Sequence, residues 1–267
     1  MNRENETLWT LKSEYVHRLA SQGLRVDNRG AFDYREIYIE PNYVTRSAGS
    51  ALVKLGNTTV LAGISMDVGQ PFPDTPNEGV IMTGAELVPL ASPTFEPGPP
   101  SEDAIELARV VDRGIRESKA IDLEKLVIEE GEKVWMVFID LHILDYDGNL
   151  FDASTLAAIT ALLNTKVPKY EDDKVIRNET SMDLPIRRIP VETTFAKIGN
   201  AILLDPVLEE EMAADARLTI ATTDDGYICA AQKGGSGAIT AEDIETIIDK
   251  AFEKGDYLRD LINKAKG

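Results

Sequence analysis

The feature that most constrains this fold is a long apolar strand that runs directly into a tight turn and a helix. Residues 133–146 form a nearly continuous β-type run, which is typical of a central strand buried on both faces. Asp147, Gly148 and Asn149 then provide turn residues. A helix follows, with Asp152 or Ser154 as the expected N-cap. Its apolar and small residues recur at helical spacing: Ala153, Leu156, Ala157, Thr160 and Leu163.

A strand that feeds into a helix N-terminus favours an anion, because free backbone N–H groups and the helix dipole both point at the turn. This turn, however, contains neither lysine nor arginine. Leu150, Phe151 and the acidic Asp152 stand where an anion would sit. A carboxylate at an Asp152 N-cap would occupy the N–H groups that a phosphate needs. The backbone pattern therefore indicates an anion site, whereas the side chains argue against one.

The rest of the chain alternates unevenly between helices and strands. Helices are expected at 7–21, from Ser101 onward, and from a Thr240–Asp243 capping pair through 252. The Ser101 helix has Ile105, Ala108, Val111 and Ile115 as its expected apolar face. Strands are expected at 32–40, 50–55, 59–66, 80–90, 184–189, 193–198, 201–204, 218–223 and 226–232.

This order predicts an α/β protein of the α+β kind, with mixed sheets and hairpins rather than a regular βαβ repeat. Residues 167–180 are expected to be a polar linker. The predicted division is an N-terminal helix and lead-in at 1–28, a first subdomain at 29–166, a linker at 167–190 and a second subdomain at 191–258.

Composition excludes several classes of protein. The chain has 267 residues and a formal net charge of −18, so broad non-specific nucleic-acid binding is disfavoured, although a local basic patch is not. No apolar run reaches the length of a membrane span, and the charged start does not resemble a signal peptide. One cysteine and two distant histidines argue against a disulfide, a zinc site or a triad, and a cytoplasmic location is expected.

Arg109, Arg113 and Arg116 fall at i, i+4 and i+7 on the Ser101 helix and form a basic stripe. Two interpretations compete. The stripe could be a solvated face paired with nearby Glu and Asp residues, which pattern alone favours about two to one. Alternatively, its guanidinium groups bind nucleic-acid phosphates.

Two further segments each have a structural and a functional interpretation. Residues 204–217 concentrate carboxylates that could hold Mg²⁺ or serve as a general acid, but composition favours a solvated acidic loop (Asp205, Glu209, Glu210, Glu211, Asp215). Residues 233–237 (KGGSG) lack the spacing of a phosphate-binding loop and are better explained as a strand-to-helix turn. Cys229 is expected to be a buried small hydrophobe, and His142 a strand residue.

Taken in order, these segments resemble the RNase PH family, and most closely the non-catalytic RNase PH-like subunits of the archaeal exosome ring. The resemblance spans nearly the whole chain: RVDNRGAFDYREIYIE, GSALVKLGNTTVLAGIS, the PGPP loop with its arginine helix, VWMVFIDLHILDYDGNLFDAS, and LLDPVLEEEMAADARLTIATT with QKGG. It implies an RNase PH-type fold, resembling the ribosomal protein S5 domain 2-like fold.

In active members of the family, the turn reads Asp-Gly-Gly-Thr-Arg, and its Thr and Arg bind phosphate. Here Asn149, Leu150 and Phe151 replace Gly, Thr and Arg. Active members also place two acidic residues six apart, and these positions are Glu211 and Arg217 here. Their consecutive arginines after the PGP segment are replaced by Pro100, Ser101 and Glu102.

Because three parts of the phosphorolytic site differ, the resemblance implies that this chain has no catalytic residue, metal or cofactor of its own. The implied partners are a catalytic RNase PH-like exosome subunit, alternating with this chain in a hexameric ring (a trimer of heterodimers), RNA-binding cap subunits and single-stranded RNA. The implied RNA contacts are Arg109, Arg113 and Arg116. Two alternatives remain: an autonomous phosphate-dependent 3′-to-5′ exoribonuclease using Glu211, Asp215 and Mg²⁺, and an assembly module without RNA contact.

Overall fold

A computed structural model of the chain describes residues 3–266, with side chains from Leu11 onward. The helices are α1 (Arg3–Ser21), α2 (Glu102–Glu117), α3 (Leu150–Leu163), α4 (Leu208–Ala213) and α5 (Ala241–Lys266), with a 3₁₀ turn at Leu123–Leu126. The strands are β1 (Ile37–Pro41), β2 (Gly49–Leu55), β3 (Thr58–Gly69), β4 (Val80–Leu87), β5 (Val127–Glu129), β6 (Lys133–Asp145), β7 (Lys166–Glu171), β8 (Lys174–Asp183), β9 (Val191–Ile198), β10 (Ala201–Leu204), β11 (Ala216–Thr222) and β12 (Ile228–Gly234).

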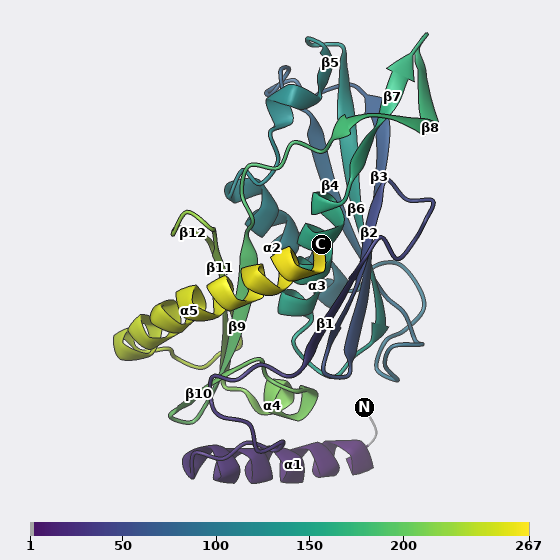
Figure 1. Ribbon diagram of the computed structural model, residues 1–267. Helices are drawn as coiled ribbons and strands as arrows, with labels where there is room; N and C mark the ends of the chain where they lie inside the picture. The colour runs from purple at the N-terminus through teal and green to yellow at the C-terminus, as the bar shows by residue number, and fades with distance from the viewer. Residues whose placement is uncertain (1–2, 267) are drawn as a thin grey trace.

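Two main sheets enclose a pair of helices (Figure 1). The larger sheet has the order β1-β2-β3-β6-β4, with β5 beside β6, and the smaller has the order β10-β9-β11-β12. Helix α3 packs on β2 and β3 of the first sheet and on β9 of the second, while α2 packs on β4 and β12. The predicted mixed α/β class is confirmed.

Strand β6 lies in the middle of the larger sheet, antiparallel to β3 and parallel to β4. Its side chains alternate: Val137, Ile139 and Leu141 are fully buried, whereas Asp140 is exposed and His142 is partly exposed. The expectation that this strand is buried on both faces was therefore wrong. Only the face toward α3 is covered completely, because the helices lie on one side of the sheet.

Helix α3 is buried on all sides, with every residue from Phe151 to Leu162 in the interior. Small residues such as Ala153 and Ala157 allow both sheets to approach its backbone closely. This helix is the centre of the main hydrophobic core, which also contains Leu107 and Ile115 of α2.

Helix α5 covers the other face of the smaller sheet, where Ile247 and Ala251 pack against Phe195 and Ile220. The predicted capping box at its start is confirmed, with reciprocal hydrogen bonds between Thr240 and Asp243. The helix runs through the predicted residue 252 and continues past Gly255 to Lys266.

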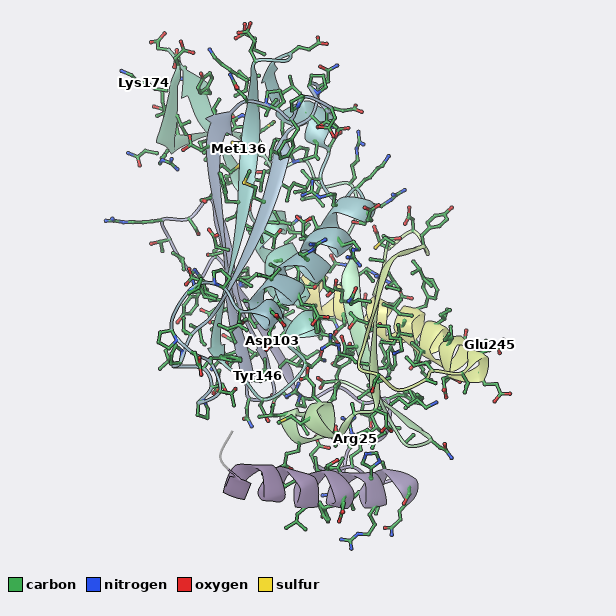
Figure 2. All side chains as sticks on the ribbon, turned by 180° about the vertical axis from the view of Figure 1, so that it is seen from behind. Arg25, Asp103, Met136, Tyr146, Lys174 and Glu245 are labelled. Atoms are coloured by element: carbon green, nitrogen blue, oxygen red, sulfur yellow. The ribbon has the colours of Figure 1, made fainter. Side chains whose placement is uncertain are left out.

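Helix α1 docks on α4 through Val16 and Ala20. The loop after α1 contributes Arg25, which lies between α1 and the smaller sheet (Figure 2). Arg25 is 3% exposed and forms a buried ion pair with Glu210 of α4. No helix among the described residues is long and apolar enough to cross a membrane.

Several local predictions were wrong. The expected polar linker at 167–180 is an antiparallel hairpin, β7–β8. Residues 184–189 form only one isolated bridge, between Ile121 and Ile186, and the strand expected at 32–40 begins at Ile37. Ile105, expected on the buried face of α2, is 49% exposed, because α2 buries the face that contains Leu107 and Val110 instead.

Candidate nucleic-acid interface

The turn before α3 is held by a left-handed residue rather than by the predicted cap. Asn149 has a φ of 57°, and its side-chain oxygen accepts a hydrogen bond from the Asp152 backbone N–H. Asn149, and not Asp152 or Ser154, is therefore the N-cap. Gly148 has a φ of 85°, and a Cβ there would lie 2.6 Å from backbone atoms at Pro206 and Leu208, so the turn is pressed against the start of α4.

A carboxylate of the chain occupies the anion position of this turn. The Asn149 backbone N–H donates to Glu211 Oε2 over 3.0 Å, and the Tyr146 hydroxyl donates to the same oxygen over 3.3 Å. Burial raises the pKa of both Glu211 and Tyr146. Glu211 therefore accepts the Asn149 N–H and Asn149 Oδ1 accepts the Asp152 N–H, so two backbone donors at this turn are paired within the chain.

Asp152, expected to occupy these N–H groups, is directed elsewhere. Its carboxylate is buried and accepts hydrogen bonds from the Tyr34 hydroxyl, Asn149 Nδ2, and the backbone N–H and hydroxyl of Thr194. Burial raises its pKa to about 7. Asp152 therefore ties α3 to β9, and Glu211 performs the role that the sequence suggested for Asp152.

The side chains at three of the degenerate positions, Phe151, Glu211 and Arg217, lie against one another. The Arg217 guanidinium lies over the Phe151 ring, 4.2 Å from its centroid, and forms a 2.8 Å ion pair with Glu106 of α2. Its Nη1 atom is 3.7 Å from Glu211 Oε1. Leu150 packs at the edge of the hydrophobic core. The space beside the turn is therefore filled by the Phe151 ring and by the ion pairs of Arg217 with Glu106 and Glu211.

The carboxylates of residues 204–217 do not gather around one site. Asp205 is buried and bonds Arg29, Arg35 and Asn149. The other carboxylates have separate partners: Glu209 with Lys12, Glu210 with Arg25, and Asp215 with the Gly199 N–H. Among the described residues, no three potential metal ligands lie close enough to hold an ion. Glu211 and Asp215 have different partners: Glu211 accepts the Asn149 N–H and Asp215 accepts the Gly199 N–H.

The arginine stripe divides into three different environments. Arg109 is exposed, and no other described residue forms a hydrogen bond or ion pair with it; it lines a surface groove with Asp140 and His142. Arg113 is half-buried and donates to Gln232 Oε1 of β12 over 3.1 Å. Arg116 pairs with Asp112 at 3.0 Å and also donates to the Ile81 carbonyl. Local pairing therefore accounts for Arg116, but not for Arg109.

Two other motifs have structural roles. Cys229 is partly buried, its thiol donates to the Gly114 and Ala221 carbonyls, and burial raises its pKa to about 11. Residues 235–237 turn tightly on the Asp215 carbonyl, which accepts the Gly237 N–H. His142 lies on β6 with its ring 3.2 Å from Glu86.

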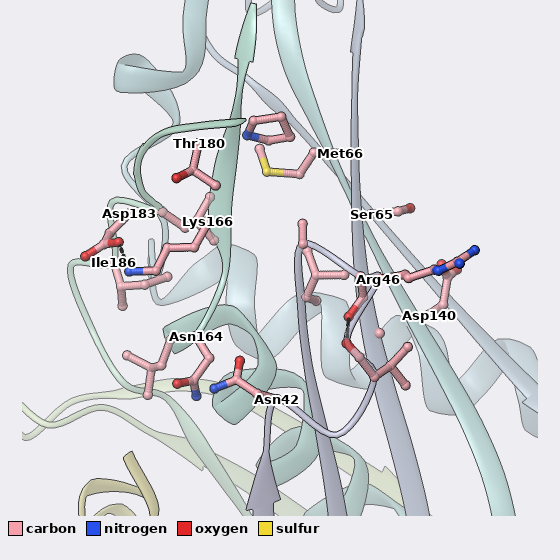
Figure 3. Close-up of a pocket in the computed structure, with 18 of the residues that line it drawn as sticks. Asn42, Arg46, Ser65, Met66, Asp140, Asn164, Lys166, Thr180, Asp183 and Ile186 are labelled. Carbon is pink, nitrogen blue, oxygen red and sulfur yellow. Dashed lines mark hydrogen bonds and ion pairs between the residues drawn. The ribbon is translucent and has the colours of Figure 1, made fainter. Parts of the chain in front are cut away.

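A large pocket lies far from the turn, near the C-terminal end of α3 (Figure 3). Asn164, Lys166 and Asp183 line it, together with Asn42 and Arg46 of the β1–β2 loop. Lys166 is paired with Asp183. None of the predicted site residues lines this pocket.

Sequence reasoning missed Glu106 and Gln232. Glu106 was grouped with the local partners of the arginines, but its cationic partner is Arg217, which is 111 residues away. Gln232 was seen only as part of the QKGG segment. The two residues belong to different elements, so only the packing of α2 on β12 brings them together.

Comparison with known proteins places this geometry in a family. Residues 33–168 match domain 1 of the 3′ exoribonuclease family (RNase PH), and residues 188–254 match domain 2. The chain is 52% identical over 266 residues to a Pyrococcus horikoshii protein named exosome complex component Rrp42, covering 98% of this chain and 97% of that one. It is 53% identical over 244 residues to the Methanothermobacter thermautotrophicus protein of that name, covering 90% of each chain.

Solved structures similar to this chain support the same family assignment. A chain of the structure titled "archaeoglobus fulgidus exosome with RNA bound to the active site" matches with a TM-score of 0.90 and 50% identity, over 95% of this chain and 98% of that one. A chain titled "Archaeal exosome core" matches at 0.87 and 45%, over 99% and 100%. Rice Rrp46, at 0.67 and 16% identity over 90% and 98%, supports the RNase PH-type fold alone. This chain belongs to the RNase PH family of 3′ exoribonucleases.

Proposed function

We propose that this chain is a non-catalytic, RNA-binding subunit of an archaeal exosome, a phosphorolytic ring that degrades RNA from its 3′ end. The observation that carries the proposal is the occupation of the anion turn by Glu211. Phosphorolysis requires a free phosphate at that turn, and a preorganised donor lost from an active site commonly costs about 10²–10³ in rate.

The similarity to archaeal exosome chains, one of them in a structure with bound RNA, supports this role. In the proposed complex, the chain alternates with a catalytic RNase PH-like subunit in a hexamer, a trimer of heterodimers, and cap subunits bind the incoming strand. Its α2 helix then contributes cations beside the partner's active site. The single cysteine fits a reducing cytoplasm.

Arg109 and Arg113 are the proposed RNA contacts, and Arg116 is a weaker candidate. Arg109 is exposed, and the Arg113 guanidinium has five N–H groups, of which one donates to Gln232. Arg116 already binds Asp112 and a backbone carbonyl. Guanidinium groups with free N–H donors suit phosphate oxygens.

The test uses the ring reconstituted from this chain and its catalytic relative. Arg109→Glu combined with Arg113→Glu should weaken single-stranded RNA binding at least about tenfold, since each charge-assisted hydrogen bond contributes ~1.5–3 kcal/mol. The native mass of the ring should be unchanged. Arg18→Glu combined with Lys264→Glu changes the net charge equally on the exposed sides of α1 and α5 and is the matched control.

Three outcomes separate the hypotheses. Phosphate-dependent shortening of RNA by this chain alone would establish the autonomous nuclease and refute a non-catalytic role. Unchanged RNA affinity in the doubly substituted ring would favour an assembly module without RNA contact. Weakened affinity in that ring, with the control ring unaffected, would support the proposal.

A further inference from the structure

The Arg113 side chain is linked to a second element by its contact with β12. Its Nη1 donates to Gln232 Oε1 over 3.1 Å. The amide nitrogen of Gln232 in turn donates to Glu106 Oε1 over 3.4 Å. Both ends of the Gln232 amide are therefore used, which fixes the orientation of the carbonyl that Arg113 meets.

The chain of hydrogen bonds continues to the degenerate phosphate site. The same oxygen, Glu106 Oε1, accepts a hydrogen bond from Arg217 Nη2 over 2.8 Å. Arg217 is itself confined by the Phe151 ring below it and by Gly234 beside it, where a Cβ would lie 2.9 Å from Nη2. Arg217 is only 18% exposed, so its position is set by packing as well as by charge.

The charged groups near Arg113 favour one position for its guanidinium group. Arg217 is the ion-pair partner of Glu106, which lies about two helical turns before Arg113 on α2 and reaches it through Gln232. Buried Glu192 lines the same very small cavity as Arg113 and Gln232. With Glu106 neutralised and Gln232 in place, Arg113 is held at the boundary between α2 and β12.

Arg109 provides an internal comparison. It is on the same helix and belongs to the same predicted contact set, but no other described residue forms a hydrogen bond or ion pair with it. Its side chain lines a groove beside β4 rather than β12. The hydrogen bonds through Gln232 that order Arg113 therefore have no direct effect on Arg109.

We propose that Gln232 is a positioning residue that, supported by Glu106 and Arg217, holds the Arg113 guanidinium in place for an RNA phosphate. The position where active relatives have a catalytic acid thus supports an RNA contact. The inference rests on the proposed function, because it assumes that Arg113 contacts RNA in the ring.

The expected gain in RNA affinity comes from preorganisation of the Arg113 side chain. Binding a phosphate with a free arginine requires the ordering of a long side chain, and this cost is removed when the side chain is already held. Gln232→Leu keeps the approximate size but removes both amide hydrogen bonds. It should weaken single-stranded RNA binding by the reconstituted ring about two- to tenfold, without a change in native mass.

A double-mutant cycle tests the assignment. Gln232→Leu is measured alone, with Arg113→Ala, and with Arg109→Ala. The expected result is that Gln232→Leu has no further effect once Arg113 is alanine, but retains its full effect when Arg109 is alanine. Arg217→Met, which removes the distal support, should weaken binding in the same direction and should also lose its effect in the Arg113→Ala background.

Each contrary outcome has its own meaning. If Arg113→Ala weakens binding while Gln232→Leu does not, the positioning role is wrong and the proposed function stands. If Gln232→Leu is equally harmful with and without Arg113, its effect is a general one on the sheet, and the positioning role is again wrong. If Arg113→Ala leaves RNA affinity unchanged, Arg113 is not an RNA contact and both proposals lose their support there.

Discussion

The guanidinium of Arg217 stacks on the aromatic ring of Phe151, with the guanidinium carbon 4.2 Å from the ring centroid. These two residues stand where active relatives have a carboxylate and a phosphate-binding arginine. A cation therefore stands at the position of the carboxylate, and an aromatic ring stands at the position of the arginine. Because each stabilises the other, restoring one alone does not restore the site.

Phe151→Arg should therefore give no phosphate-dependent RNA shortening by the isolated chain, and should destabilise it. Phe151 is 5% exposed, so the substitution buries a second cation against Arg217. We expect a loss of about 3 kcal/mol or more in the free energy of unfolding, measured in urea. Phe151→Met, which keeps an apolar side chain, should cost under about 1.5 kcal/mol. Any phosphorolysis by the arginine variant would contradict this account.

The contribution of Arg109 to RNA binding should be visible in the salt dependence. For single strands, each neutralised phosphate contributes about 0.7 to the slope of log affinity against log salt. Arg109→Ala should reduce the slope of the assembled ring by about that amount. Arg116→Ala should leave the slope unchanged, because Arg116 is engaged by Asp112 and the Ile81 carbonyl. Equal slopes for the wild type and Arg109→Ala would count against the contact.

Glu192 should make the protein less stable as the pH rises. Burial raises its pKa from 4.5 to about 8, so between these values the folded state binds a proton that the unfolded state has released. Stability should fall over that window, with a slope approaching ~1.4 kcal/mol per pH unit from this group.

Glu192→Gln should flatten this profile and be more stable than wild type near pH 8–9. Its Oε2 accepts the Thr155 hydroxyl, while Oε1 has no hydrogen-bond partner among the described residues. Exposed Glu245→Gln is the control and should leave the profile unchanged. Chemical denaturation at pH 5, 7 and 9 makes the comparison. An unaltered pH profile in Glu192→Gln would show that Glu192 is not the titrating group.

The buried Arg25–Glu210 ion pair should contribute more to the free energy of unfolding than the exposed Lys12–Glu209 pair. Glu210→Ala leaves Arg25, which is 3% exposed, without its carboxylate and should cost about 3–5 kcal/mol. Glu209→Ala breaks the exposed pair with Lys12 and should cost under about 1 kcal/mol. Urea unfolding of both variants provides the measurement, and similar losses would contradict the assignment.

Local sequence signals predicted the elements whose stability is local. The pairing of the strands predicted at 50–55 and 59–66, the helix start at Ser101 and the Thr240–Asp243 capping box are confirmed. In each, a residue interacts with another only a few positions away. The β7–β8 hairpin was missed for the opposite reason. Its second strand is mostly exposed, so it lacks the apolar alternation that identifies a strand.

The candidate site was predicted less completely, because its contacts join distant segments. Comparison with the family pattern pointed to Phe151, Glu211 and Arg217. Nothing local indicates that Glu211 reaches the Asn149 N–H across 62 residues, or that Gln232 meets Arg113 across 119. Asp152 was assigned to the cap because of its position in the first turn, whereas β9 offers it a full set of donors.

The turn at Gly148 is also a joint between the two halves of the chain. The Leu208 N–H donates to the Asp147 carbonyl, and Arg35 binds the carbonyls of Asp147 and Gly148. A chain whose turn binds no phosphate would therefore still need this loop to hold its two halves together. Superposition of backbones would then not separate chains that have a phosphate site from chains that lack one. Only a few side chains at the turn would distinguish them.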